Sequence, residues 1–488
     1  MDIQDVHCIV IGAGIGGLAA GALLARKGMQ VTLLEMQGYP GGCAGTFSLD
    51  GYRFDAGATL GCGFHKGGPM EALGRELDIS WPVRPEPVAW QYRHGDLSLD
   101  LSGSRKAIID RFPRSASFWK EQAMLAELLW KLSYGGLSWP VAGPRDLAHL
   151  ARKAISEIPG TARLLKFATM TALEWLAAHG LDTDGEFVRF IDAQLLVSVQ
   201  TTSHDANAVN AAIALDLPVS GAYSVQGGIG RISELLADSI ERDGGAVLYG
   251  KKVIRMDSIR REMLGVETGD GDALAADLVI ADLTPDSLVL LEGRTPEPAG
   301  VAAPTRWGAF TVYLGIDAAV MGQAGINHLQ ITAAEGELGE GGSIFVSASP
   351  ADDPTRAPDG LRAVTISTHT RPEPWFNALA AGRQAYLELK ERYTRQVLDL
   401  LIEQVPEAAG AIRSTTSATP VTWERWTGRS RGYVGGYGQT SLFDVRSPST
   451  AYDNLFLAGD SIFPGQSLPG VVTGARRTIE LALRRYGK

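Results

Sequence analysis

The stretch His7-Cys8-Ile9-Val10-Ile11-Gly12-Ala13-Gly14-Ile15-Gly16-Gly17 decides the fold of this chain. Its first five residues form a short apolar run with β-branched side chains, which predicts a buried parallel strand. Residues 18–27 are rich in alanine and leucine and predict a helix that ends at Gly28, and residues 31–34 predict a second strand. Strand, glycine-rich turn, helix and strand in this order are typical of a dinucleotide-binding unit.

Three glycines and one acid of this unit carry the chemistry. Gly12 makes the tight turn, Gly14 lets the backbone approach a pyrophosphate, and Gly17 lets the helix pack against the strand. The phosphates then meet the positive end of the helix dipole. Glu35 follows Gly17 by eighteen residues, where a carboxylate accepts hydrogen bonds from both hydroxyls of an adenosine ribose and disfavours a 2′-phosphate.

The composition is that of an ordinary globular protein. The chain has 488 residues, of which 45 % are hydrophobic and 20 % charged, and its formal net charge is −10. These values exclude a disordered or fibrous chain and argue against a nucleic-acid partner. The three cysteines, Cys8, Cys43 and Cys62, have no paired spacing, so we expect neither a disulfide framework nor a metal site.

The start of the chain and its apolar runs predict the location of the protein. Asp2 and Asp5 precede the first strand, without the basic segment of a signal peptide. No uncharged apolar run reaches the ~18 residues that a spanning helix needs. We therefore expect a cytoplasmic protein that is able to lie peripherally on the inner face of the membrane.

The stretch after Glu35 separates FAD from NAD by its likeness to a known family. Gly41-Gly42 and residues 51–57 resemble the extended FAD fingerprint of the amine oxidase and phytoene desaturase superfamily. Many members of that superfamily carry arginine after the glycine pair, whereas this chain has Cys43. The resemblance therefore implies FAD as the cofactor, with its phosphate charge met by backbone dipoles.

The middle of the chain returns to the nucleotide domain. Residues 227–230 are glycine-rich and precede an amphipathic helical pattern, and four short strands follow at 246–249, 253–256, 264–268 and 278–281. In the family the strand after this helix offers its backbone to the adenine edge, and Val253 is the matching residue. The alternative is that Val253 belongs to an ordinary α/β segment that makes no contact with a ligand.

The far end of the chain carries the second half of the expected cofactor site. Residues 454–458 predict a buried strand that ends at Gly459-Asp460, and a helix follows from about residue 468 to Tyr486. Open parallel sheets hold ligands at the carboxyl ends of their strands. By resemblance, Asp460 accepts from the ribityl hydroxyls, and the amides of Gly470 and Val471 stabilise negative charge at flavin N1 and O2.

Further C-terminal motifs point to one branch of the superfamily. They resemble carotene isomerases and carotenoid 3,4-desaturases more than bacterial phytoene desaturases. These motifs are Gly459-Asp460-Ser461, Pro464-Gly465-Gln466-Ser467, Thr427-Gly428-Arg429 and Val434-Gly435-Gly436.

The expected fold class is α/β, with a discontinuous Rossmann-like FAD-binding domain and a substrate domain of a mixed sheet with a helical cap. We assign residues 1–110, 206–292 and 414–488 to the FAD-binding domain. Residues 111–205 and 293–413 form the substrate domain, with strands at 310–316, 343–347 and 363–368 and helices at 118–132 and 161–177.

The helical cap has an unusual charge. Residues 111–170 contain nine basic against four acidic residues, a net charge of +5, with Trp119, Trp130, Tyr134 and Trp139 interleaved. Basic and tryptophan residues combine in this way in helices that lie in a membrane interface, which would admit a water-insoluble substrate. A solvated cap with tryptophans in its core is the alternative.

No catalytic triad, metal cluster or pair of carboxylates stands at a readable spacing, so we expect the cofactor to carry the reaction. The catalytic residues stay unassigned. His65, after the predicted flavin hairpin, is the best candidate for proton transfer, against the alternative of a structural histidine. The glycines at 227–230 lack a convincing strand before them and therefore do not form a second dinucleotide-binding motif. For this reason we do not expect tightly bound NAD(P)H, and we expect oxygen or a membrane quinone as the electron acceptor.

The resemblance implies an FAD-dependent oxidoreductase that acts on a long apolar isoprenoid, by carotenoid desaturation with hydride transfer to flavin N5. A carotene cis-trans isomerase, or a retinol-saturase-like enzyme with reduced FAD, stays open, as does an amine oxidase. An escort protein of the Rab GDP-dissociation inhibitor type shares the fold without flavin. The complete motif at residues 459–475 argues against that last alternative.

Overall fold

A five-stranded parallel sheet is built around the first strand of the chain. The computed structural model describes residues 2–134, 138–156, 164–296, 306–320 and 327–486. The strand order across this sheet is β10 (Ala246–Leu248), β2 (Gln30–Leu34), β1 (His7–Ile11), β14 (Leu278–Ala281) and β21 (Leu455–Leu457). All four pairings are parallel. The strands predicted from the apolar runs are therefore confirmed, and one sheet joins the start, the middle and the end of the chain.

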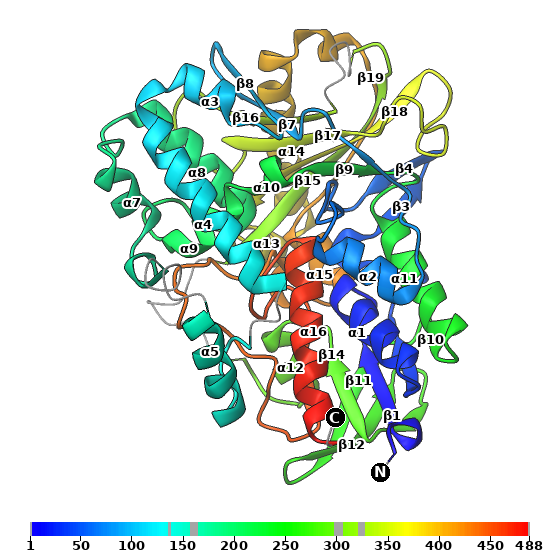
Figure 1. Cartoon of the computed structure of the whole chain (residues 1–488). Coiled ribbons are helices and arrows are strands. Elements are labelled where there is room, and N and C mark those ends of the chain that lie inside the picture. Colours follow the sequence, from blue (N-terminus) through cyan, green and yellow to red (C-terminus); the bar gives the residue numbers. More distant parts are fainter. Residues whose placement is uncertain (1, 135–137, 157–163, 297–305, 321–326, 487–488) are drawn as a thin grey trace.

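Helices cover one face of this sheet. They are α1 (Ile15–Arg26), α2 (Pro69–Leu77), α11 (Gly230–Arg242) and α16 (Leu468–Arg484). Val10 and Leu33 of the sheet share a buried apolar cluster with Leu23, Ile240 and Val472 of these helices. Figure 1 shows α1 and α16 side by side on this face.

The opposite face is covered by three antiparallel strands, β11 (Val253–Ile259), β12 (Glu262–Thr268) and β13 (Ala273–Ala275), and by α12 (Pro285–Leu291). Ile9 and Val279 alternate with Val10 and Ile280, so they reach this second layer, where they pack with Met263. Burial on both faces explains why the parallel strands are almost uniformly apolar.

The second large sheet is mixed and has eight strands. Seven of them follow the order β19 (Ile412–Ala418), β15 (Trp307–Asp317), β18 (Leu361–Thr370), β17 (Ser343–Ala348), β16 (His328–Thr332), β7 (Trp90–His94) and β8 (Leu97–Leu101), and β20 (Tyr433–Val434) pairs with β15. The β16–β7 pairing is parallel and the others are antiparallel. The expected mixed sheet is confirmed. Because β7 and β8 belong to it, segment 1–110 contributes to both large sheets.

Helices α13 (Glu373–Ala381), α14 (Arg383–Gln404) and α15 (Pro420–Thr427) pack near this sheet. Phe310 of β15 stacks on Trp375 of α13 with ring centroids 5.2 Å apart. The remaining strands are short: β3 (Thr46–Leu49) and β4 (Tyr52–Asp55) form a hairpin, and β5 (Gly61–Cys62) and β6 (Val83–Pro85) flank β9 (Ala222–Val225). A strand therefore does precede residues 227–230, but it is antiparallel and outside the nucleotide sheet.

The cap is helical, as expected, and lies beside the mixed sheet (Figure 1). Its helices are α3 (Lys106–Arg111), α4 (Ala116–Tyr134), α5 (Pro144–Ser156), α7 (Ala172–Ala178), α8 (Gly185–Val199), α9 (Ala208–Ala214) and α10 (Leu217–Ser220). The single helix predicted at 161–177 is wrong within its described part. Thr171 and Glu174 form a capping box that starts α7 anew, and residues 157–163 lie outside the described residues.

The tryptophans of the cap point inward. Trp119 is 2 % exposed, the indole N–H of Trp130 donates to Asp216 at 2.9 Å, and that of Trp139 donates to the Leu442 carbonyl at 3.1 Å. Trp119 therefore lies in the cap core, as in the alternative interpretation, whereas Trp130 and Trp139 are half-buried. Among the described residues, no helix is both long and apolar enough to span a bilayer.

Candidate functional site

The carboxyl ends of the five parallel strands bring together residues from the whole chain. We call this part the carboxyl edge and define it by Glu35 after β2, Gly12 after β1, Asp282 after β14 and Asp460 after β21. The strand order fixes the order of these residues along the edge, with Glu35 at one end and Asp460 at the other. This edge is where open parallel sheets hold ligands.

The glycine loop requires its glycines for packing as well as for access. Gly12 has a φ of +97°, and its N–H donates to the Leu34 carbonyl at 2.8 Å. A Cβ on Gly17 would lie 2.4 Å from the Gly12 carbonyl oxygen, so α1 packs against β1 only with glycine there. A Cβ on Gly14 would lie 2.3 Å from Oδ2 of Asp282. The expected roles of Gly12 and Gly17 in the turn and in helix packing agree with this geometry.

Glu35 is held in place by the backbone around it. Its carboxylate accepts hydrogen bonds from the Ala13 N–H at 2.8 Å and from the Gln37 N–H at 2.7 Å. Burial raises the pKa of Glu35, and these backbone donors oppose that shift. One carboxylate oxygen faces each donor, and the remaining lone pairs stay available for the predicted ribose hydroxyls.

The glycine pair lies directly against the glycine loop. Gly41 has a φ of +121° and donates its N–H to the Ala13 carbonyl at 2.7 Å. Gly42 is exposed, and a Cβ built on it would meet only the Gly14 Cα, at 3.7 Å. A ligand can therefore reach backbone without side chains on both sides of the contact between the two glycine segments, at Gly14 and at Gly42. The cradle of partly exposed glycines fits the diphosphate of FAD.

Arg429 brings a positive charge to the carboxyl edge. Its Nη2 donates to both carboxylate oxygens of Asp460, at 2.7 and 2.9 Å, and its Nε donates to the Tyr433 carbonyl at 2.6 Å. The guanidinium also interacts with Cys43. Burial opposes the charge of Arg429, but Asp460 outweighs burial and raises the pKa of the guanidinium.

The expectation that backbone dipoles meet the phosphate charge stays a prediction, but the site also holds a guanidinium that sequence reasoning did not place there. The sequence has Cys43 next to the glycine pair, and the structure brings a guanidinium to Cys43 from a segment 386 residues further along the chain. Sequence reasoning noted Arg429 only as part of a branch motif. It missed Asp282 altogether, although an acid directly after a predicted parallel strand was a readable signal.

The start of α16 differs from its expected form. The Gly470 N–H donates to the Ser467 hydroxyl at 3.2 Å, and the Val471 N–H donates to the Ser467 carbonyl at 2.9 Å. Both amides that were expected to face flavin N1 and O2 are thus engaged within the helix start. Their predicted role would require both amides to be released from Ser467, although the positive end of the α16 dipole does lie at this helix start.

Val253 and His65 lie near the two ends of the site. Val253 opens β11 shortly after Lys251, whose N–H donates to the Glu35 carbonyl at 2.8 Å, so its place at the adenosine end remains a prediction. His65 follows Gly63, where a Cβ would lie 3.1 Å from Pro469 of α16. Burial lowers the pKa of His65, which favours the neutral imidazole.

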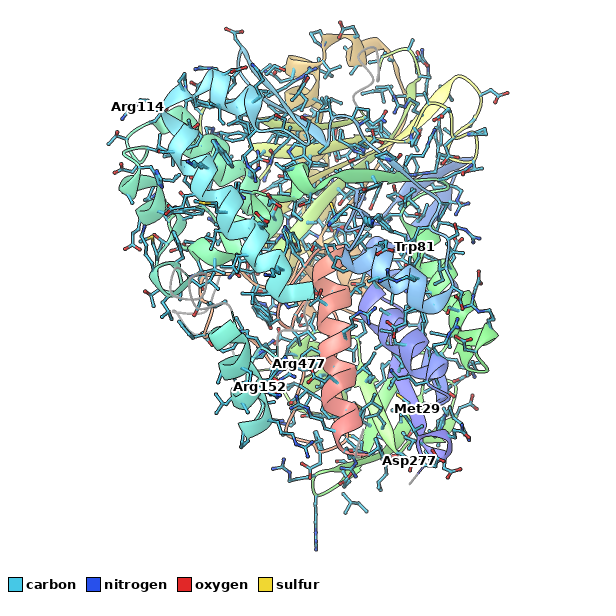
Figure 2. The ribbon with its side chains drawn as sticks, viewed as in Figure 1. Met29, Trp81, Arg114, Arg152, Asp277 and Arg477 are labelled. Carbon is cyan, nitrogen blue, oxygen red and sulfur yellow. The ribbon has the colours of Figure 1, made fainter. Side chains whose placement is uncertain are left out.

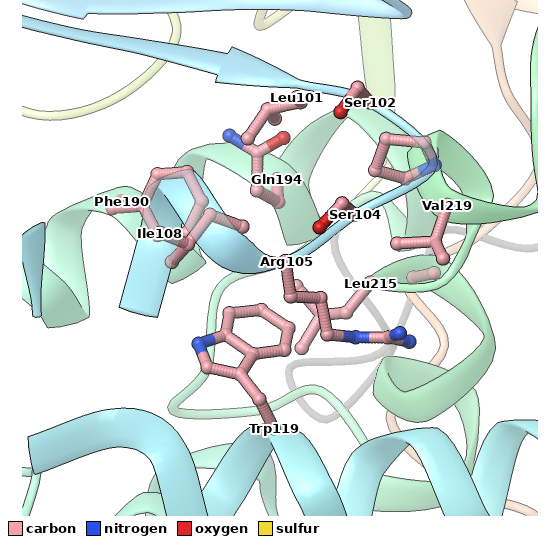
Figure 3. A pocket seen from close by; sticks show the side chains of 12 residues that line it. Leu101, Ser102, Ser104, Arg105, Ile108, Trp119, Phe190, Gln194, Leu215 and Val219 are labelled. Carbon is pink, nitrogen blue, oxygen red and sulfur yellow. The ribbon is translucent and has the colours of Figure 1, made fainter. Parts of the chain in front are cut away.

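A pocket of the cap is formed by other residues (Figure 3). Ile108, Trp119 and Phe190 give it an apolar wall, and Arg105 closes it with an ion pair to Asp216 at 2.5 Å. None of the twelve residues that line it belongs to the predicted cofactor motifs.

The comparison with protein families decides the identity of the fold. The profile of the family described as "Flavin containing amine oxidoreductase" matches residues 15–480. This chain belongs to that family. As a member of the flavin containing amine oxidoreductases, it is an FAD-dependent oxidoreductase with the α/β fold expected for the family, and the FAD prediction is confirmed. The flavin-free escort alternative finds no support in this match.

Relatives of known name place this amine oxidoreductase in the carotenoid-related branch that its motifs predicted. It is 25 % identical to prolycopene isomerase 1 of an Oncidium hybrid cultivar, over 99 % of this chain and 86 % of the relative. It is 27 % identical to the phytoene dehydrogenase of Streptomyces griseus, over 97 % and 94 %. A solved oxidoreductase from Methanosarcina mazei has a TM-score of 0.65 at 17 % identity, covering 97 % of this chain and 100 % of that one, which shows the fold alone.

Proposed function

We propose that this FAD-dependent oxidoreductase desaturates a long apolar isoprenoid of the carotenoid type, with oxygen or a membrane quinone as electron acceptor. The observation that carries the proposal is the near full-length match to a relative named phytoene dehydrogenase. The names of other relatives also refer to polyenes, namely prolycopene, diaponeurosporene and retinol. Bound FAD would supply a hydride acceptor at N5.

The residues of this chain would hold the cofactor at the carboxyl edge. Glu35 would accept from the ribose, and the backbone of Gly12, Gly14, Gly41 and Gly42, of which Gly42 is the most exposed, would contact the diphosphate. Asp460, with Gly459 before it, would accept from the ribityl chain while Arg429 fixes its orientation. His65 is the candidate proton acceptor and would act as a neutral imidazole.

Carotene cis-trans isomerisation is the second candidate, because relatives named prolycopene isomerase cover 96 to 99 % of this chain. The redox state of the flavin separates the two reactions. A desaturase acts from oxidised FAD and removes two hydrogens, whereas an isomerase acts from reduced FAD without a change in mass.

We expect the purified protein to be yellow and to dehydrogenate a partly saturated carotenoid in air, with a mass loss of two hydrogens per new double bond. Detergent-dispersed carotenoid and product mass spectrometry measure this. Simple amines serve as the control substrates. Hydrogen peroxide formed from amines without polyene turnover would move the assignment to amine oxidation. Conversion of a cis-polyene at constant mass by dithionite-reduced enzyme, without aerobic desaturation, would establish the isomerase instead.

Glu35→Gln is expected to weaken FAD binding by about tenfold to a hundredfold, since a hydrogen bond to a charged group contributes ~1.5 to 3 kcal/mol. The amide also turns an N–H towards the Ala13 or Gln37 donor, which a carboxylate does not. Flavin fluorescence on dilution of the holoenzyme measures the dissociation constant. Glu267→Gln, on β12, is the control and should bind FAD as the parent does. Equal affinity of both variants would contradict the ribose assignment.

We also propose that the cap docks reversibly on anionic membranes. Residues 111–170, through which we expect it to dock, carry a net charge of +5. Three apolar side chains of this segment are exposed: Met124 at 47 %, Leu147 at 58 % and Leu165 at 71 %. Trp119 takes no part, because it is buried in the cap.

The chain should co-sediment with liposomes that contain anionic phospholipid at low salt, and salt should release it, because charges are screened beyond ~10 Å at 0.1 M. Leu147→Ser with Leu165→Ser should reduce binding. Leu264→Ser, exposed to 47 % on β12, is the matched control. If the chain does not bind these liposomes at low salt, the membrane-docking proposal is wrong and the cap is an ordinary solvated surface.

A further inference from the structure

Asp282 occupies an unusual place for a carboxylate. Its Oδ2 accepts a hydrogen bond from the Gly17 N–H at 3.0 Å, at the start of α1. A Cβ on Gly14 would lie 2.3 Å from Oδ2, and a Cβ on Gly459 would lie 2.3 Å from Oδ1. The carboxylate is therefore wedged between the glycine loop and the Gly459-Asp460 turn, two elements of the proposed cofactor site.

The strand order places Asp282 under the middle of the cofactor. If FAD runs along the carboxyl edge from Glu35 after β2 to Asp460 after β21, it passes over the ends of β1 and β14. The middle of FAD is its diphosphate, which carries two negative charges. This placement rests on the proposed cofactor site, and it brings a dianion to a carboxylate.

The other charges at the edge do not relieve this contact. Glu35 and Asp460 are also acidic, and Arg429 already donates two hydrogen bonds to Asp460. Cys43 also lies close enough to feel the charge of Asp282, and burial raises the pKa of its thiol to about 11, so it is neutral. Of the three charged groups that act on Asp282, Glu35 and Asp460 are acidic and Arg429 alone is basic.

We propose that Asp282 takes up one proton from solvent when FAD binds, so that a neutral carboxyl group lies beneath the diphosphate. The carboxylate and the proton form the carboxylic acid, and no other bond changes. Oδ2 keeps the Gly17 N–H, and the new O–H at Oδ1 becomes a donor for a phosphate oxygen. The proton converts a repulsive neighbour into a hydrogen-bond donor.

The acidity of Asp282 before cofactor uptake suits this role. Its pKa is raised to about 6, and burial is the largest cause. Asp460 and Glu35 also raise the pKa, whereas the Gly17 N–H and Arg429 lower it. A carboxyl group with this pKa is mostly ionised at neutral pH and needs only a modest additional field to become protonated. A dianion next to it supplies a field of that sign.

The test is the pH dependence of FAD affinity. Below about pH 6 Asp282 already carries its proton, so affinity is constant. Above that pH the free protein must take up a proton, and the dissociation constant is expected to rise by up to about tenfold per pH unit until the pKa of the bound form is passed. FAD released from diluted holoenzyme, measured by its fluorescence between about pH 6 and pH 9, gives this curve.

Asp282→Asn should bind FAD with a flat pH dependence and, at about pH 8, more tightly than the parent, because the amide is a permanent neutral donor. Asp277→Asn is the matched control, since Asp277 precedes β14 at its opposite end and accepts from the His7 N–H. It should retain the slope of the parent.

Calorimetry in two buffers of different ionisation enthalpy counts the protons directly, with about one expected per FAD near neutral pH. FAD binding without proton uptake by the parent overturns the inference, as does a slope or proton uptake that persists in Asp282→Asn. If that variant does not fold, Asp282→Ser replaces it in both measurements. Failure of the parent to bind FAD at all would instead overturn the proposed cofactor site.

Discussion

Arg429→Met is expected to weaken FAD binding by about a hundredfold, because two effects act together. Asp460 loses both charge-assisted hydrogen bonds from Arg429, and hydrogen bonds of this kind contribute ~1.5 to 3 kcal/mol. The carboxylate, 15 % exposed, then faces the cofactor without its counter-charge. Methionine keeps the length of the side chain, so the packing of the α15–β20 connection changes little. Flavin fluorescence on dilution of the holoenzyme measures the effect.

A second substitution tests whether the charge itself matters. Because the guanidinium of Arg429 reaches Cys43, Cys43→Arg in the Arg429→Met background returns a positive charge to nearly the same place. The added arginine should raise the FAD affinity at least about tenfold above that of Arg429→Met alone. The control is Arg413→Met, which breaks an exposed ion pair with Asp317 and should not change FAD binding. If Arg429→Met binds FAD with unchanged affinity, Arg429 is not part of the cofactor site.

The local half of the site was predictable because it depends on spacing. Between Gly12 and Glu35 the chain forms one strand, one helix and a second strand, and this unit has few geometric solutions. The hydrogen bond from Ala13 to Glu35 joins residues only 22 positions apart. The apolar runs that form β14 and β21 were equally readable, since strands buried on both faces have no polar alternation to obscure them.

The remote half was not predictable in the same way. Asp282 and Arg429 meet the glycine loop and Cys43 across 265 and 386 residues, and no periodicity records such a meeting. The position of Asp282 follows from the strand order, which only the complete sheet fixes. Arg429 depends on a turn after α15, whose position is set by packing beside the mixed sheet.

The cap shows how local signals compete. The apolar pattern over residues 161–177 predicts one helix, but Thr171-x-x-Glu174 is a capping-box signature inside it, and the capping box prevails in the structure. The tryptophans match an interfacial pattern in composition. The indole N–H groups of Trp130 and Trp139 find acceptors inside the protein, Asp216 and the Leu442 carbonyl, and composition alone cannot reveal such partners.

Asp146→Ala is expected to lower the free energy of unfolding by ~3 to 5 kcal/mol, since it removes a fully buried carboxylate that pairs with two arginines. Asp146 is fully buried at the start of α5, and it accepts from Arg477 at 2.6 Å and from Arg484 at 2.5 Å, both on α16. Figure 2 labels Arg477 beside α16. Arg477 is itself only 5 % exposed. This ion-pair network joins α5 of the cap to α16.

Glu480→Ala is the matched control, because Glu480 pairs with the same two arginines but is 45 % exposed, and its loss should cost at most ~1 kcal/mol. Urea unfolding of both holoenzymes measures the difference. The arginines hold the pKa of Asp146 below its usual range against the effect of burial, so its contribution is complete above about pH 4 and is lost as the pH falls towards the pKa of the folded state. The stability difference between parent and Asp146→Ala should therefore narrow in acid. Equal costs for the two substitutions, or a difference that does not change with pH, would show that burial of this ion pair does not secure the cap.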